Sequence, residues 1–332
     1  MNFSDLLSGS FQQGLGTSAI VYCLAAIGLN IHFGYTGLLN FGQAAFMAVG
    51  GYTMAMLVVQ WDVSLWLAML VGLVLAALLA LLLGIPTLRL RADYLAIVTI
   101  AAAEIVRQLY GSIALKKYFG AQDGLTSFSA DFRALNPFSG PVDLGFVSWS
   151  KDDAWVVLAG WTTIALCCVL VWLLMRSPWG RVLKSIREDE DAVRSLGKNV
   201  YAYKMQALMI GGMIGALAGF FTALKSAAMN PTFVATDVTF FAYTVLLIGG
   251  AARVLGPVVG AVIFWFLLTF LDLFLSAATD DEGSVLIPEA IMTNQQASLM
   301  RFIVMGLALM LLMIFRPQGI FGDRRELAID GR

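Results

Sequence analysis

Residues 64–86 read SLWLAMLVGLVLAALLALLLGIP and contain no charged side chain. A helix that crosses a membrane needs about 20 predominantly apolar residues, whereas a surface helix of a soluble domain keeps a polar face. Residues 154–175 form a second long stretch without charge. These two stretches predict an all-α protein built as a polytopic bundle of transmembrane helices.

The composition of the whole chain favours the same class of protein. Of the 332 residues, 59% are hydrophobic and 13% are charged, whereas soluble domains are about 45–50% apolar and about 25% charged. The 21 Lys and Arg nearly balance the 22 Asp and Glu, so we expect no nucleic-acid partner. One histidine, and three cysteines without metal-ligand spacing, argue against a metal centre. We expect a protein that works in the lipid bilayer and holds no cofactor of its own.

Seven further apolar segments raise the predicted number of spans to about nine. They cover residues 15–32, 42–59, 94–112, 204–225, 239–252, 256–276 and 299–315. The segments 42–59 and 239–252 are short and contain glycine, so each is interpreted as a full span, a half-span or a re-entrant piece. Together the segments predict one transmembrane domain over residues 1–332.

The distribution of basic residues predicts the orientation. Fourteen of the 21 Lys and Arg lie in four connections, mainly in residues 176–204 and in the tail after residue 315. Because basic loops stay in the cytoplasm, the N-terminus is predicted outside and the C-terminus inside. The connections 113–153 and 277–298 are then external loops, too small for cores of their own. The first 14 residues lack the positive charge of a signal peptide, so we expect the first span to be retained.

The connection 177–203 is the least apolar stretch of the predicted cytoplasmic side. Apolar residues recur at helical spacing from Val182 to Leu196, which predicts an amphipathic helix over 182–197 with Gly197 as its C-terminal cap. Two interpretations remain open. The helix is either an interfacial connector or a docking helix for a cytoplasmic partner, and a helix held between two spans can transmit a push to both.

Two glycine-rich stretches interrupt the apolar pattern, at residues 34–46 and 247–257. Broken segments in corresponding halves of a transporter are typical of inverted repeats around a central transport site. The alternative is that both are ordinary glycine-rich turns in the cytoplasm. Small residues also recur every four positions, which predicts close helix packing. They are Gly72, Ala76, Ala80 and Gly84 in one span, and Gly211, Gly215 and Gly219 in another.

Few ionisable residues lie within or beside the predicted spans. Glu104 and Arg107 are three residues apart on one helical face, which favours a structural ion pair or, alternatively, a place in the translocation path. Lys225 and Asp237 flank the predicted outer ends of two spans and are interpreted as interfacial. His32, at the inner end of the first span, is also expected at the interface.

The sequence contains no phosphate-binding loop and no nucleophile with a matching base, so the chain is not expected to be an enzyme. If transport is driven by ATP, another subunit must hydrolyse it. A stand-alone secondary carrier would need a residue for a coupling ion, and only Glu104 and Asp272 are candidates. The scarcity of charges in the spans suits a zwitterionic or neutral solute.

Five blocks of sequence resemble one transporter family in order and in spacing. They are GYTGLLNFGQAAFMAVGGYTMAML (34–57), ADYLAIVTIAAAEIVRQL (92–109), RVLKSIREDEDAVRSLGKNVYAYK (181–204), IGGAARVLGPVVGA (248–261) and FRPQGIFG (315–322). Over nearly the whole chain they resemble branched-chain amino acid ABC-transporter permeases of the LivM type. Permeases of urea transporters are similar across the same blocks.

The resemblance implies a multi-pass permease subunit in the bacterial plasma (inner) membrane. Its partners would be a second, LivH-like permease, two cytoplasmic ATPases and an extracytoplasmic solute-binding protein. It would move branched-chain or other hydrophobic amino acids by alternating access, with ATP used by the partner subunits. A permease for urea or short amides and a stand-alone secondary carrier are the alternatives.

The resemblance also implies the functional residues. The helix in 182–197 would contact an ATPase through Arg187, Glu188, Asp189, Glu190, Ala192 and Gly197. ABC importers often carry an EAAxxxG pattern there, and this chain differs in having Asp191 for one alanine and its glycine one place later. For the translocation pathway we predict Asn40, Gln43, Tyr52 and Thr99, with Glu104 as a further candidate.

Overall fold

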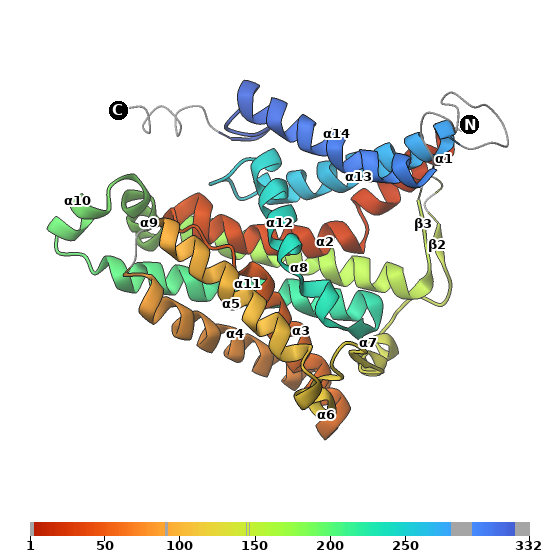
Figure 1. The fold of residues 1–332 in the computed structure, drawn as a ribbon, viewed down its shortest axis with the longest axis horizontal. Helices are drawn as coiled ribbons and strands as arrows, with labels where there is room; N and C mark the ends of the chain where they lie inside the picture. The colour runs from red at the N-terminus through yellow and green to blue at the C-terminus, as the bar shows by residue number, and fades with distance from the viewer. Residues whose placement is uncertain (1–2, 90–91, 144, 146, 280–293, 323–332) are drawn as a thin grey trace.

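The computed structural model describes residues 3–322 apart from residues 90–91, 144, 146 and 280–293. The described chain is a bundle of helices with two very short antiparallel strand pairs (Figure 1). Helix α10 (Glu190–Ser195) projects at one end, which we call the arm end. The strand pair β2 (Val142–Asp143) and β3 (Ser148–Trp149) lies at the opposite end, the hairpin end. The predicted class, an all-α transmembrane bundle, is confirmed.

Seven helical stretches of the described residues are long and apolar enough to cross a membrane. They are α2 (Thr17–Leu29) with the π-helix η1 (Asn30–Tyr35), α3 (Gln43–Trp61), α4 (Leu65–Thr87), α8 (Lys151–Arg176), α11 (Val200–Ser226), α13 (Gly256–Thr279) and α14 (Asn294–Phe315). An eighth span would be α5 (Ala92–Tyr110) continued past a 55° bend by η2 (Ile113–Leu115) and α6 (Lys116–Phe119).

The ninth predicted span corresponds to α12 (Thr236–Gly249), which has only 14 residues. At 1.5 Å per residue it is about 21 Å long, shorter than the hydrocarbon core of about 30 Å. Each of the nine predicted segments thus corresponds to a helix of the structure. Nine complete crossings are not established, because α12 is short. That number, and the orientation that depends on it, stay predictions.

Helix α1 (Phe3–Gly14) was not expected from the sequence, because its residues are too polar and too few for a span. It lies along α13 (Figure 1). The rings of Phe11 and Phe266 are 4.9 Å apart, and a Cβ added at Gly14 would lie 3.2 Å from the Cβ of Phe266. Leu6, Ser10 and Gly14 of α1 are buried, whereas Phe3 and Phe11 stay partly exposed.

Helix α11 forms the centre of the bundle and packs against α2, α3 and α4. Its glycines face its neighbours closely: a Cβ added at Gly215 would lie 3.2 Å from the Cβ of Phe46 on α3. The small residues of α4 face α11 in the same way, since a Cβ at Gly72 would lie 2.9 Å from the ring of Phe220. The predicted close packing of these two small-residue faces is confirmed.

The predicted external connection 113–153 carries short elements at the hairpin end, including η2, α6 and α7 (Ala130–Ala134). Strand β1 (Leu125–Thr126) pairs with β4 (Ala228–Met229), which follows α11 and precedes η3 (Pro231–Val234). Most of the second predicted external loop, 277–298, lies outside the described residues.

Candidate translocation and coupling site

The chain between η1 and α3 interrupts the bundle, and we call residues 37–42 the broken segment. It begins at Gly37, whose φ of +73° favours glycine. Leu38, Asn40 and Gly42 are buried. Irregular backbone at membrane depth needs internal partners for its N–H and C=O groups, so the contacts of this segment decide what it can do.

Asn40 and His32 hold the broken segment together from inside. The Oδ1 of Asn40 accepts the N–H of Gly42 at 2.9 Å, which directs its amide nitrogen to Nδ1 of His32 at 3.0 Å. Nδ1 therefore accepts, and Nε2 carries the proton and donates to the carbonyl of Leu208 at 3.2 Å. His32 is 0% exposed, so the expected interfacial role was wrong. The ring is buried because it supplies polar partners to a helix break.

Gln43, the first residue of α3, sits where three helices meet. Its Nε2 lies 3.3 Å from the carbonyl oxygens of Ala25 on α2 and Gly211 on α11. Its Oε1 is buried and has no hydrogen-bond partner among the described residues. A side chain that joins three helices and keeps one free acceptor is suited to sense their relative movement.

Two further helices attach to the broken segment through hydroxyl groups. Thr99 of α5 accepts the N–H of Phe41 at 3.0 Å through its Oγ1. On α12, Thr239 accepts the N–H of Ala44 at 3.0 Å, and Tyr243 donates to the carbonyl of Asn40 at 2.9 Å. Thr239 and Tyr243 were missed by the sequence analysis, although their spacing of four residues puts them on one helix face. The structure thus brings Asn40, Gln43 and Thr99 together.

Tyr52 and Glu104 lie away from this cluster. Tyr52 is nine residues beyond Gln43 on α3, about 14 Å along the helix, and its ring stacks on Tyr110 at 4.2 Å. Glu104 forms a two-pronged ion pair with Arg107, with distances of 2.5 and 2.9 Å. The structural ion pair that the spacing predicted is therefore present. A pathway role for Tyr52 and Glu104 stays a prediction.

The two glycine-rich stretches contact each other through Asn30 of η1. Its Nδ2 donates to the carbonyl of Arg253 at 2.8 Å, and its Oδ1 accepts the N–H of Ala252 at 2.8 Å. A Cβ added at Gly34 would lie 2.7 Å from the backbone nitrogen of Ala252. Whether the two stretches belong to an inverted repeat stays a prediction, but the fold places them side by side.

A third block of the sequence joins this junction. The N–H groups of Ile320 and Phe321 donate to the carbonyls of Ile248 and Gly249, at 2.9 and 3.1 Å. These carbonyls belong to the last turn of α12 and have no partner within that helix. The segment FRPQGIFG therefore closes the end of α12 beside the turn that Asn30 holds.

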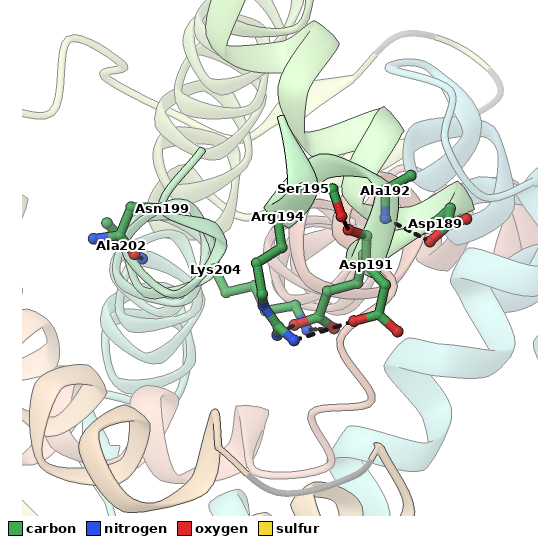
Figure 2. A network of polar contacts seen from close by, with 9 residues as sticks. Asp189, Asp191, Ala192, Arg194, Ser195, Asn199, Ala202 and Lys204 are labelled. Atoms are coloured by element: carbon green, nitrogen blue, oxygen red, sulfur yellow. Dashed lines mark hydrogen bonds and ion pairs between the residues drawn. The ribbon is translucent and has the colours of Figure 1, made fainter. Parts of the chain in front are cut away.

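The predicted single helix over 182–197 is in fact two helices, α9 (Pro178–Glu188) and α10. The break lies at Asp189, whose backbone is extended and whose carboxylate accepts the N–H of Ala192 at 2.9 Å (Figure 2). Asp189 thus caps α10, which the helical spacing alone could not show. Gly197 ends α10 as predicted, with φ +76° and its N–H donating to the carbonyl of Arg194 at 3.0 Å. We call α9 and α10 together the arm.

Charged side chains fasten the arm to the bundle. Arg194 pairs with Asp191 at 3.1 Å and with Glu190 at 2.9 Å (Figure 2). Glu190 also forms an ion pair with Lys204, which belongs to the first turns of α11. The ion pair therefore links α10 directly to the central helix.

Arg187 connects α9 to the broken segment and its surroundings. Its Nη1 donates to the carbonyl of Gly34 at 2.5 Å, and its Cγ would lie 3.4 Å from a Cβ added at Gly37. Leu183 and Ile186 anchor the same helix by burial. Of the six predicted coupling residues, Arg187 and Glu190 bond to the bundle, whereas the other four, Glu188, Asp189, Ala192 and Gly197, are exposed.

The arm also exposes an apolar residue that the sequence analysis assigned to its buried face. Leu196, directly after α10, is 80% exposed. Leu196 lies beyond the break at Asp189 and is not part of the buried face that Leu183 and Ile186 form.

A bundle with at least seven helices that are long and apolar enough to cross a membrane defines a polytopic membrane protein. The chain belongs to the family described as branched-chain amino acid transport system / permease component, whose model matches residues 13–314.

Relatives are known from bacteria and archaea. The chain is 27% identical to the high-affinity branched-chain amino acid transport system permease protein LivM of Escherichia coli, over 92% of this chain and 69% of that protein. It is 25% identical to a probable LivM of Methanocaldococcus jannaschii, over 92% of this chain and 91% of that one. A nucleoside ABC transporter permease, NupC of Lactococcus lactis, is 24% identical over 55% of this chain and 57% of its own length.

These similarities confirm the resemblance seen in the sequence and the predicted location as a multi-pass protein of the inner membrane. The chain is an ABC-transporter permease, and such membrane subunits are not themselves enzymes. Because similar permeases carry names for different solutes, membership establishes the type of transporter and not its substrate.

Proposed function

We propose that this chain is one membrane subunit of an ABC importer for branched-chain or other hydrophobic amino acids. The relatives matched over 92% of the chain are named as LivM permeases, which supports this substrate class. In the proposed assembly, two cytoplasmic ATPases supply the energy, a solute-binding protein delivers the amino acid, and a LivH-like permease completes the pathway.

The contact between Arg187 and Gly34 is the observation that carries the proposed mechanism. When the ATPases close on ATP, they displace α10, and α9 moves with it. The bond from Arg187 passes that movement to η1 and the broken segment. Because Asn40 and Gln43 link the segment to α2, α11 and α12, a small displacement there changes how these helices pack.

A second route runs through the ion pair between Glu190 and Lys204 into α11. A third runs from η1 through Asn30 to residues 252–253, which precede α13. One push on the arm thus reaches helices from both halves of the chain. Rocking of these helices against the partner permease would open the pathway first to one side and then to the other.

The stand-alone carrier is the less favoured alternative, because both candidate residues for a coupling ion already have cationic partners. Glu104 pairs with Arg107, and Asp272 pairs with Arg301 at 2.5 Å between α13 and α14. A carboxylate neutralised in this way has little charge left with which to bind a cation.

The proposal is tested by purification from native membranes, followed by assay of the purified complex in liposomes. We expect two ATPases and a second permease to co-purify, and leucine with its binding protein to stimulate ATP hydrolysis. Stimulation by urea and not by leucine would overturn the proposed substrate. Solute transport by the chain alone, driven by an ion gradient, would overturn the importer.

A further inference from the structure

A cavity of about 280 Å³ opens among α2, α3, α11, α12 and α13, away from the arm. With about 30 Å³ for each water molecule, it has room for roughly nine waters, which suits a small solute. It lies near the lower limit of about 300 Å³ for ligand pockets. The broken segment does not line it, so it is distinct from the site described above.

Two opposite charges, on the exposed residues Lys225 and Asp237, line the open side of this cavity. Lys225, in the last turn of α11, donates to Oγ of Ser18 at 2.7 Å. Asp237, in the first turn of α12, accepts the N–H of Val238 at 3.0 Å. Within the described part of the chain neither residue forms an ion pair. An ammonium has three donors and a carboxylate about four acceptor positions, so both groups keep capacity for a ligand.

A third polar group in the cavity wall has no partner. The Nε1 of Trp265 on α13 is buried, and no residue that the structure describes accepts its proton. Buried indole N–H groups usually find an acceptor. An oxygen atom of a molecule inside the cavity would satisfy it.

The remaining wall is mixed: the hydroxyl groups of Ser18, Thr222, Ser226 and Thr232 lie beside an apolar part. Val21, Met47 and Val238 line the cavity, and the rings of Tyr22 and Trp265 lie 5.3 Å apart beside them. This apolar part favours an aliphatic side chain, since burying it removes apolar surface from water. The cavity therefore combines a cation, an anion and an apolar surface within a volume that fits one small molecule.

We infer that this cavity binds an aliphatic amino acid as a zwitterion, with Lys225 holding the carboxylate and Asp237 the ammonium group. This inference rests on the proposed function, because it names a pocket, open to the surface of the chain, where the transported solute would pause. Both residues are exposed at the ends of their helices, which agrees with the interfacial position expected from the sequence and leaves them accessible to a solute.

The test is equilibrium binding to the purified full-length chain, using leucine and two analogues that each lack one charge. Leucinamide has no carboxylate, and 4-methylpentanoate has no ammonium group. We expect leucine to bind about tenfold more tightly than either, which corresponds to about 1.4 kcal/mol for each charged contact. Equal binding of all three, or no binding of leucine, would overturn the inference.

Two substitutions assign the contacts. Lys225→Gln should abolish the preference for leucine over leucinamide and keep the preference over 4-methylpentanoate, and Asp237→Asn should do the reverse. Lys117→Gln and Asp131→Asn, at exposed positions outside the cavity, are the matched controls and should change neither ratio. Because each readout is a ratio on one protein, partial loss of folded material does not affect it. Unchanged ratios in both cavity variants would contradict the assignment.

Leucine uptake by the assembled transporter separates this inference from the proposed function. If uptake persists while the purified chain binds no leucine, the inference about the cavity is overturned and the proposed importer function stands. Selective leucine binding by the chain, with no leucine uptake by the complex, would overturn the importer and leave the cavity as a binding site.

Discussion

Asn40 provides hydrogen-bond partners for more groups in and around the broken segment than any other side chain described above. Its amide bonds to Gly42 and His32, and its carbonyl accepts from Tyr243. All of these groups are buried, so removing the amide leaves a donor and an acceptor without partners. Such groups cost about 1–3 kcal/mol each. The broken segment therefore depends on this residue for its shape.

We predict that Asn40→Leu lowers the free energy of unfolding by about 2–4 kcal/mol. The measurement is denaturant-induced unfolding of the purified chain in detergent. The comparison is Asn199→Ala, which removes the exposed cap of α11 and should cost about 1 kcal/mol. Equal losses in the two variants would show that the buried network contributes little.

Gly34 is the residue that lets the two glycine-rich stretches touch. Gly34→Ala places a Cβ about 2.7 Å from the backbone of Ala252, so one of the two backbones must shift. We predict loss of transport together with a lower unfolding temperature. Gly306→Ala in α14 is the matched control, because nothing lies within 4 Å of its added Cβ, and it should keep both. Normal transport by Gly34→Ala would show that the junction tolerates separation.

Among the helices, α10 is the element whose surface faces away from the bundle. We predict that Leu196→Ser reduces the amount of ATPase that co-purifies with the permease, because burial of this leucine in a partner groove is worth about 1.5–3 kcal/mol. The unfolding of the isolated permease should not change, since Leu196 is 80% exposed.

Ile113→Ser is the matched control for this prediction. Ile113 is 85% exposed and precedes α6 at the far end of α5, so the variant should keep normal ATPase recovery. If both variants recover the same amount of ATPase, Leu196 does not belong to the surface that binds the ATPase.

The elements also show what sequence can and cannot predict. Long uncharged stretches such as 64–86 predict their helices directly, because span length and hydropathy are local properties. The break at Asp189 was missed, because an aspartate within an acidic run is equally typical of a helix N-cap and of an exposed position inside a helix. His32, Thr239 and Tyr243 were missed because their roles depend on contacts between distant parts of the chain.

At the scale of the whole molecule, the number of crossings decides where the termini lie. Nine crossings place the termini on opposite sides of the membrane, and eight place them on the same side. The basic residues predict an external N-terminus and a cytoplasmic C-terminus.

Protease-accessible tags at both termini, in right-side-out vesicles, measure this directly. We expect cleavage of the N-terminal tag only. Protection of both tags would contradict the odd number of crossings, and α12, about 21 Å long, would be the first candidate for the incomplete one.

The central claim is that the arm drives the bundle through Arg187. The most direct measurement is the amount of leucine imported per ATP hydrolysed by the assembled transporter in liposomes. We predict that Arg187→Met keeps the complex and its ATP hydrolysis but lowers this ratio at least about tenfold, since a charge-assisted bond to Gly34 is lost. Arg181→Met, on the exposed face of α9, should keep the wild-type ratio. An unchanged ratio in Arg187→Met would contradict the account.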